Sequence, residues 1–283
     1  MPLISIFILT KDEEKNLPVA LESVAGLDVE VFIVDSGSND HTIELARAAG
    51  CAVVTHAFTT HAHQVNWALD NLPFSSDWVM RLDADERLTL ELVGELRVTL
   101  PDLSPDVTGL MIKRRVYFWG RWIRHGGYYP TWLLRIWRRG AAQCEERDMD
   151  EHMLIKHGRI GNLEHDIIDE NRKGIGFWIE KHNRYADKEV AALSRAAEVT
   201  DATQIGRATA RKRFFKNMLY DRSPRFLRAF LYWAFRYFGQ FGFLDGKAGF
   251  VFHFLQGFWY RLLVDAKLTE AELVRRADLR GPQ

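Results

Sequence analysis

The stretch VEVFIVDSGSNDHT, residues 29–42, joins an apolar run, interrupted only by Glu30, to a polar turn of small residues. Such a run is typical of a strand that is buried on both faces of a parallel sheet. Gly, Ser, Asn and Asp suit the turn, because they supply hydrogen-bonding groups and tolerate tight backbone geometry. The stretch therefore predicts a strand that closes at Asp35 and a loop that leads into a helix.

The surrounding sequence repeats this arrangement. Further buried strands are predicted over 3–10, 51–58 and 77–86. Apolar residues recur at helical spacing over 15–27, 42–50 and 63–72. Strands that alternate with helices at this distance indicate βαβ units, so we expect a doubly wound α/β domain.

The middle and the end of the chain differ from this pattern. Residues 107–120 and 131–140 predict longer, partly alternating strands around a Gly-rich turn, as in an antiparallel addition to the sheet. From Ile175 onward the pattern is helical. The predicted fold class is therefore an α/β mixed sheet flanked by helices, followed by a helical C-terminal region.

Composition excludes several classes of protein. Apolar residues make up 47% of the 283 residues and charged residues 27%, which excludes bulk disorder and fibrous structure. Lys+Arg and Asp+Glu both count 38, which argues against a globally basic nucleic-acid binder. With Cys51 and Cys144 as the only cysteines, no disulfide framework is expected and a reducing compartment is favoured. The apolar run after Met1 lacks the features of a signal peptide, so we expect the chain on the cytoplasmic side.

Charge and aromatic residues are unevenly distributed. Residues 207–267 contain 18 of the 35 aromatic residues and 12 Lys/Arg against three Asp. The segment 211–243 mixes cations and aromatics at helical spacing, which predicts a helix in an anionic membrane interface. An ordinary core helix, a dimer surface or a single-stranded nucleic-acid site are the alternatives. The apolar run 248–260 is shorter than the roughly 20 residues that span a bilayer, so no transmembrane helix is predicted.

Two carboxylates, Asp83 and Asp85, follow the fourth predicted strand. Ligands of open α/β sheets bind at the carboxyl ends of the strands. Two acids in one turn there are suited to share Mg²⁺ or Mn²⁺, which in turn neutralises a diphosphate. A solvated acidic turn, or a helix cap at Asp85, is the alternative interpretation.

Three motifs in order resemble family 2 glycosyltransferases with a GT-A fold: TKDE (10–13), VDSGSNDHT (34–42) and RLDADE (81–86). The resemblance covers roughly residues 1–170. The stretch FWGRWIRHGGYYPTWLLRIWRRG (118–140) is similar to a narrower subgroup, the bacterial lipopolysaccharide-core and related cell-surface glucosyltransferases. The resemblance implies a nucleotide-sugar donor, a divalent metal, and inversion at the anomeric carbon.

The resemblance also implies roles for individual residues. Thr10 and Glu13 would line the nucleotide pocket, and Asp35, with Ser36 beside it in the turn, would hold the base. Asp83 and Asp85 would manage the ribose and the metal, with His165 as a candidate third metal ligand or diphosphate donor.

A further carboxylate is needed as the base that takes the proton of the acceptor hydroxyl. The segment CEERDMDEHM (144–153) offers several acids. Family resemblance favours Glu151, with Asp150 in reserve. The others lie in a loop that is otherwise typical of a solvated acidic surface.

These observations predict a metal-dependent, inverting glycosyltransferase that adds one hexose, with UDP-glucose as the expected donor, to a lipid-anchored saccharide. The Q-x-x-R-W motif of processive synthases is missing, which favours single-sugar addition. We expect a catalytic domain over 1–170, with a nucleotide-sugar half (1–105) and an acceptor half (106–170). Residues 171–283 would attach it peripherally to the cytoplasmic face of the inner membrane, with no nucleic-acid partner.

Three alternatives stay open at the level of sequence. A polyprenyl phosphate acceptor would keep the fold but need less help from a base, because it already carries negative charge. A sugar nucleotidyltransferase would carry a glycine-rich, basic loop after the first strand, where this chain has TKDEE (10–14). A catalytically silent membrane scaffold would tolerate the loss of Asp83 and Asp85.

Overall fold

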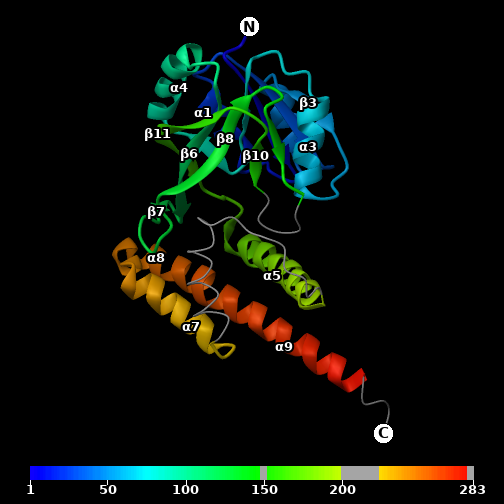
Figure 1. The fold of residues 1–283 in the computed structure, drawn as a ribbon, viewed down its shortest axis with the longest axis vertical. Helices are drawn as coiled ribbons and strands as arrows, with labels where there is room; N and C mark the ends of the chain where they lie inside the picture. Colours follow the sequence, from blue (N-terminus) through cyan, green and yellow to red (C-terminus); the bar gives the residue numbers. More distant parts are fainter. Residues whose placement is uncertain (147–151, 199–222, 279–283) are drawn as a thin grey trace. The chain divides into compact units, whose positions relative to one another are not determined.

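The computed structural model describes residues 1–146, 152–198 and 223–278, and the segment that contains Asp150 and Glu151 lies outside these ranges. The described chain forms two compact units. The first comprises Met1–Trp122 and Tyr128–Gly174, and the second comprises Ile123–Gly127 and the residues from Ile175 onward. Figure 1 shows the sheet of the first unit and the helices of the second.

The first unit is built on one mixed sheet, in the order β3-β2-β1-β4-β8-β6-β11-β5, with β7 paired to β6. Strands β1, β2, β3 and β4 are mutually parallel, β8 is antiparallel to β4 and β6, and β11 is parallel to β6. The strands of this sheet are β1 (Ile4–Thr10), β2 (Val29–Asp35), β3 (Ala52–Thr55), β4 (Trp78–Arg81), β5 (Glu86–Leu88), β6 (Val107–Phe118), β7 (Arg121–Trp122), β8 (Thr131–Arg138) and β11 (Arg159–Asp169). A separate two-stranded sheet pairs β9 (Ala142–Cys144) with β10 (Met153–Ile155).

Helices cover both faces of the sheet (Figure 1). One face packs against α1 (Leu17–Val24), α2 (Thr42–Ala48) and α4 (Leu90–Asp102), and the core there includes the fully buried Ile6 and Ile8. The other face packs against α3 (His61–Asn71) around Phe7 and Trp137. Alternate residues of β1 thus enter two separate cores, which explains why the strand is apolar on both faces apart from the buried Ser5 and Thr10.

The predicted fold class is confirmed: the unit is a mixed α/β sheet flanked by helices. Two predicted strands were too long. β3 ends at Thr55, and the strand predicted over 77–86 ends at Arg81. The chain turns directly afterwards, where the Glu86 amide donates to the Asp83 carbonyl at 2.8 Å. Asp83 and Asp85 therefore lie in a turn between β4 and β5.

The second unit is helical. Its elements are α5 (Gly174–Glu198), which starts at the last residue of the first unit, α7 (Leu227–Ala234), η1 (Phe235–Gly239), η2 (Gly242–Asp245), α8 (Gly246–His253), η3 (Phe254–Trp259) and α9 (Tyr260–Asp278). Tyr260 Oη donates to Glu189 at 2.6 Å, which ties α9 to α5. Among the described helices, none combines the length and the apolar character that crossing a bilayer requires.

A short loop from the middle of the chain is built into this helical unit. His125 donates to the buried carboxylate of Asp245 through its amide at 3.0 Å, and its Nδ1 lies 2.7 Å from the same group. The Gly126 amide donates to the Gln240 carbonyl at 2.9 Å, and Arg236 Nε donates to the Gly126 carbonyl. The loop 123–127 is therefore held by the helices that follow it more than 100 residues later.

The central position of β1 leads to a first prediction. Ile6→Ala removes a fully buried side chain, so we expect the free energy of unfolding of the sheet unit to fall by about 2–5 kcal/mol. Leu90→Ala serves as the matched control because Leu90 is 87% exposed, and its effect should stay within about 0.5 kcal/mol. Urea unfolding followed by circular dichroism measures both, and equal effects would contradict the assigned core.

Candidate active site

The carboxylate of Asp35 organises the ends of the first two strands. It is completely buried and accepts hydrogen bonds from Thr10 Oγ1, the Gly37 amide and the Ser38 amide, each at 2.8 Å. A fourth comes from Ser38 Oγ at 2.5 Å. Gly37 has a φ of +83°, which glycine adopts without steric cost. Four donors fill the capacity of one carboxylate, so in this structure Asp35 orders the turn.

These contacts also settle the charge of Asp35. Burial acts to raise its pKa, but the hydrogen bonds from Ser38, Thr10 and Gly37 outweigh burial and leave the pKa below the ordinary value. The group is therefore ionised at neutral pH. Its predicted contact with the nucleotide base stays a prediction, as does that of Ser36, whose half-buried hydroxyl accepts from Gln64 Nε2 at 3.1 Å.

The loop after β1 is hydrogen-bonded to the loop after β2. The Asp12 amide donates to Ser38 Oγ at 2.8 Å, and the Glu13 amide donates to Thr42 Oγ1 at 2.7 Å. Asp40 accepts from the Glu14 amide at 3.1 Å. Asp40 also accepts from the amide of Thr42, the first residue of α2, at 3.0 Å. The two motifs TKDE and DSGSNDHT thus form one hydrogen-bonded platform at the carboxyl edge of the sheet.

Asp83 lies in a network of opposite charges. Arg81 Nε donates to its Oδ1 at 3.0 Å, and Arg135 Nη2 donates to its Oδ2 at 2.7 Å. Burial alone would raise the pKa of Asp83, but Arg135 and then Arg81 lower it well below the usual range. His61, the first residue of α3, contributes to the same lowering. Asp83 is therefore a carboxylate, with 31% of its side chain exposed.

Glu86 shares the same guanidinium. Arg135 Nη2 donates to Glu86 Oε1 at 2.5 Å, and the Asp83 amide donates to Glu86 Oε2 at 3.1 Å. Burial raises the pKa of Glu86 to about 7; Arg135 opposes this shift, and Asp83 adds to it. Arg135 itself is 5% exposed, so one buried cation bridges two acids from the turn and β5.

Asp85 does not share the arginine contacts of Asp83 and contacts the segment after β11. Its carboxylate is half-buried and accepts from Asn171 Nδ2 at 3.0 Å, while its carbonyl accepts from the Glu170 amide at 2.9 Å. The Arg172 amide donates to Asn16 Oδ1 at 2.8 Å. The segment after β11 thus returns to the turn and to the loop after β1. It closes this part of the carboxyl edge.

Glu13 is held by the same returning segment. Its carboxylate accepts from Lys173 Nζ at 2.5 Å and from Asn16 Nδ2 at 2.7 Å. Burial raises the pKa of Glu13 above the ordinary value, the contacts with Lys173 and Asn16 oppose the rise, and the nearby charge of Asp85 adds to it. The structure therefore places Glu13 near Asp85, as two acids at one edge of the sheet.

The structure separates His165 from these acids. The His165 amide donates to Glu95 Oε2 of α4 at 3.0 Å. Asp85 meets the chain at Glu170, five residues further along, which is about 15 Å at the rise of a strand. The prediction of His165 as a third ligand beside Asp85 therefore finds no support in this geometry. The register shift of β11 between Asn162 and Asp166, which sequence does not reveal, accompanies this placement.

Asp83 and Asp85 differ in how freely their carboxylates could bind a divalent cation. Asp83 is bound by two guanidinium groups, whereas the half-buried Asp85 accepts from one amide nitrogen and offers hard oxygen donors. Within the described ranges, no group of three or more His, Cys, Asp or Glu side chains is arranged to hold a metal. Asp85 is therefore the residue best placed to bind Mg²⁺ or Mn²⁺ together with oxygens of a bound donor. The candidate bases, Glu151 and Asp150, lie outside the described residues.

Sequence analysis missed four residues of this site: Arg135, Asn171, Lys173 and His61. A signal for Arg135 was present, because a charged residue between apolar neighbours in TWLLRIWRRG (131–140) needs a buried partner. Nothing in the sequence indicates that Asn171 and Lys173 return to the first loop. No motif in the sequence indicates that His61, the first residue of α3, influences Asp83.

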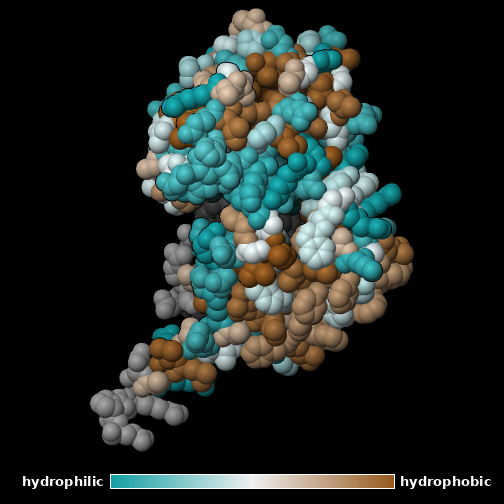
Figure 2. Space-filling model, turned by 180° about the vertical axis from the view of Figure 1, so that it is seen from behind, coloured by the Kyte–Doolittle hydropathy of each residue, from teal (hydrophilic) through white to brown (hydrophobic). Residues whose placement is uncertain are grey.

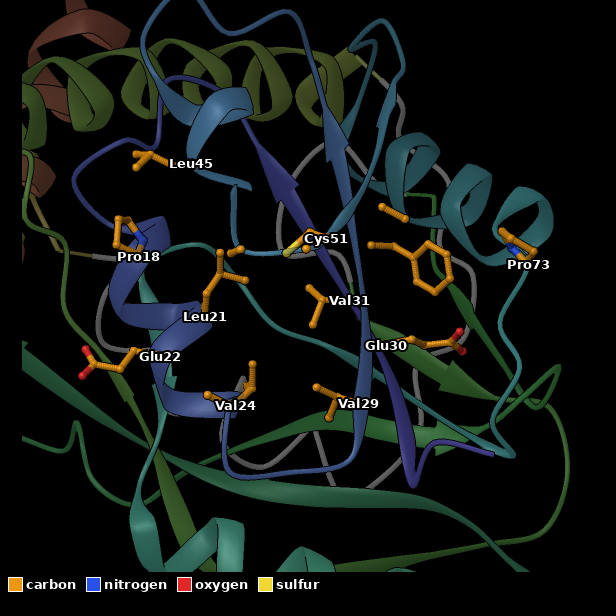
Figure 3. Close-up of a pocket in the computed structure, with 15 residues that line it drawn as sticks. Pro18, Leu21, Glu22, Val24, Val29, Glu30, Val31, Leu45, Cys51 and Pro73 are labelled. Atoms are coloured by element: carbon orange, nitrogen blue, oxygen red, sulfur yellow. The ribbon is translucent and has the colours of Figure 1, made fainter. Parts of the chain in front are cut away.

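A large groove lies elsewhere on the unit. Its volume is about 820 Å³, and α1, α2 and the first half of β2 line much of it. Figure 3 shows Leu21, Val29 and Val31 directed into this groove. The residues of the candidate site follow the opposite, carboxyl ends of β1, β2 and β4. We therefore place the chemistry at the carboxyl edge, where charged groups converge, and not in this mainly apolar groove.

Comparison with known proteins shows which sequences this chain is similar to. Uncharacterized glycosyltransferases of Rickettsia typhi and Rickettsia conorii are 36% and 39% identical to this chain over 106 and 103 residues. These matches cover 38% and 36% of this chain, and 36% of each relative, so the chain spans little more than a third of their length.

A solved structure shares the fold over most of the chain. The mannosyltransferase PcManGT from Pyrobaculum calidifontis, in complex with GDP-Man and Mn²⁺, has a TM-score of 0.51 at 14% identity. The match covers 95% of this chain and 87% of that one. The model of the glycosyl transferase family 2 matches residues 5–165, which is more than half of the chain. By fold, motif order and family match, this chain belongs to glycosyl transferase family 2.

Proposed function

We propose that this glycosyltransferase transfers a single hexose, with UDP-glucose as the expected donor, to a lipid-anchored saccharide such as a lipopolysaccharide core. The observation that carries the proposal is the convergence of three motifs at one sheet edge. The loops after β1 and β2 are hydrogen-bonded to each other, and Asp85 in the turn after β4 lies near Glu13. An edge of this kind is where α/β sheets bind nucleotides.

Different residues have different roles in the proposed inverting transfer. Asp35 and Thr10 hold the turn against which the nucleotide binds. Glu151 removes the proton of the acceptor hydroxyl as its oxygen bonds to the anomeric carbon, and the bond from that carbon to the diphosphate breaks in the same displacement. The displaced diphosphate leaves with the electron pair.

Asp85 would hold a divalent cation, which would supply positive charge to the departing diphosphate. Asp83, held by Arg81 and Arg135, would bind the ribose and would not enter the metal shell directly. The buried guanidinium of Arg135 fixes the turn between β4 and β5, because it binds Asp83 and Glu86 at once. The donor site is thereby ordered before the donor binds.

A donor screen tests the proposed reaction. Purified protein is mixed with UDP-glucose, UDP-GlcNAc or GDP-mannose, with and without membrane extract from a strain that lacks this protein, and nucleotide release is measured. We expect UDP release from UDP-glucose to rise at least tenfold when extract is present. Release from another nucleotide sugar alone would contradict the donor, and release with polyprenyl phosphate as sole acceptor would contradict the saccharide acceptor.

The metal role of Asp85 gives a second test. We expect Asp85→Ala to abolish transfer while it changes the free energy of unfolding by less than about 1 kcal/mol, because the side chain is half-buried and accepts one hydrogen bond. Asp77→Ala is the matched control, an exposed aspartate just before the same strand. EDTA should stop the unaltered enzyme, and Mn²⁺ should restore it. Near-normal turnover in EDTA would refute the metal requirement.

The identity of the base gives a third test. Glu151→Gln should lower kcat on a saccharide acceptor by roughly 10²–10⁴ and leave the Kd of the donor unchanged, because only proton removal is lost. Glu146→Gln is the control, an exposed acid of the same segment. If Asp150→Asn gives the large loss and Glu151→Gln does not, the base is Asp150.

A further inference from the structure

The helical unit carries large apolar side chains on its surface. Eleven Phe and Leu side chains between residues 226 and 254 are each 38–59% exposed. We call them the apolar face: Phe226, Leu227, Phe230, Leu231, Phe235, Phe238, Phe241, Phe243, Leu244, Phe250 and Phe254. Figure 2 shows brown and tan atoms gathered over the lower part of the view, where this unit is drawn.

Helical geometry separates this face from the packed interior of the unit. Leu227, Phe230, Leu231, Phe235 and Phe238 recur at the spacing of one side of a helix. The opposite side packs inward: the Trp233 ring lies 5.5 Å from that of Tyr237 and 6.4 Å from that of Phe258. The buried cluster of the unit, Ala186, Tyr260 and Val264, contains no member of the apolar face, although Phe230 and Phe238 also contact the Trp233 ring.

The extent of the apolar face exceeds that of ordinary surface patches. Eleven half-exposed side chains of this size present on the order of 1,000 Å² of apolar surface. The largest patch of a soluble monomer is roughly 300–600 Å². All eleven side chains are hydrocarbon, without the polar end of Tyr or Trp. A partner surface that is itself continuous hydrocarbon fits such a face.

The charges around the apolar face favour a lipid surface. Between Pro224 and Val264 the sequence has one acid, Asp245, which is 2% exposed, whereas Lys247 of α8 is exposed. Anionic headgroups would attract the exposed Lys247, whereas the same residue of a second copy would repel it. Arg228 and Arg261 are bound within the unit, to Asp265 and Glu189. Attachment through this face therefore depends mainly on apolar contact.

We propose that the apolar face inserts into the headgroup and acyl boundary of an anionic bilayer and so holds the protein on the membrane. The proposal does not depend on sugar transfer, because binding can be measured without donor or acceptor. The sequence predicted membrane contact through cations and aromatic side chains together. The proposal assigns the attachment mainly to the apolar side chains. Among the described residues, the arginines of this region that form ion pairs contribute little to attraction.

Vesicle flotation of the full chain tests the proposal. The vesicles contain phosphatidylcholine alone or with 30% phosphatidylglycerol, at 0.1 M and 1 M NaCl. We expect the protein to float with anionic vesicles and to lose less than about threefold in partition coefficient at 1 M, where the screening length falls to about 3 Å. Complete release by 1 M salt would overturn apolar insertion and leave electrostatic attraction alone.

Variants of the apolar face, compared with a control, test whether this surface is the part of the protein that contacts the membrane. The triple variant Phe235→Gln, Phe238→Gln and Phe250→Gln removes three rings of the apolar face, and should lower the partition coefficient at least tenfold. The control, Leu90→Gln, Val98→Gln and Leu273→Gln, replaces three side chains of equal or greater exposure elsewhere and should leave it unchanged. Thermal unfolding establishes that both variants are folded.

Sedimentation velocity separates a lipid from a second copy of the chain. We expect a monomer without vesicles, or an oligomer that the triple variant leaves intact. An oligomer that the triple variant dissociates, with no flotation of the unaltered protein, would overturn the proposal in favour of a protein interface. Equal flotation of the triple variant and the unaltered protein would overturn it as well.

Discussion

One buried carboxylate, that of Asp35, determines the geometry of the nucleotide end of this molecule. It closes β2 and binds the end of β1 through Thr10, and it fixes the following turn through two backbone amides. A charge without water is tolerable only when it is fully hydrogen-bonded, so the turn has little freedom to rearrange. The loop after β1 then binds this turn through Asp12 and Glu13. The donor platform therefore follows from the requirement to satisfy a single buried charge.

The acidic turn after β4 is stabilised by a different principle. Arg135 comes from a strand antiparallel to β4, and its guanidinium lies between Asp83 and Glu86. Removing such a cation would leave Glu86 buried without a cation and Asp83 with Arg81 alone, which is why the turn and β5 depend on it. Asp85 is left out of this network. The same short motif thus contains one acid engaged by the protein and one acid whose oxygens are available to a ligand.

Sequence predicted the parts of this structure that local patterns determine. Apolar runs located β1, β2 and β4, and the carboxyl ends of parallel strands must share an edge, so Thr10 and Asp35 could be expected to meet. The partnership of Arg135 with Asp83 depends on antiparallel register, which the pattern of 131–140 does not specify. The position of His165 depends in a similar way on a register shift within β11, so its role as a metal ligand or diphosphate donor stays a prediction. For the helical unit, composition predicted a membrane surface but not that Arg225, Arg228 and Arg261 form ion pairs within the unit.

The loop 123–127 limits how far this protein can be treated as modular. The chain leaves the sheet after Trp122, enters the helical unit for five residues, and returns at Tyr128. A cut at Gly174 would therefore leave His125 without the carboxylate of Asp245 and Gly126 without Arg236. Exchange of the helical region between relatives would have to exchange this loop as well. The helical unit is then encoded discontinuously in the gene, with its two parts separated by the strands that complete the sheet.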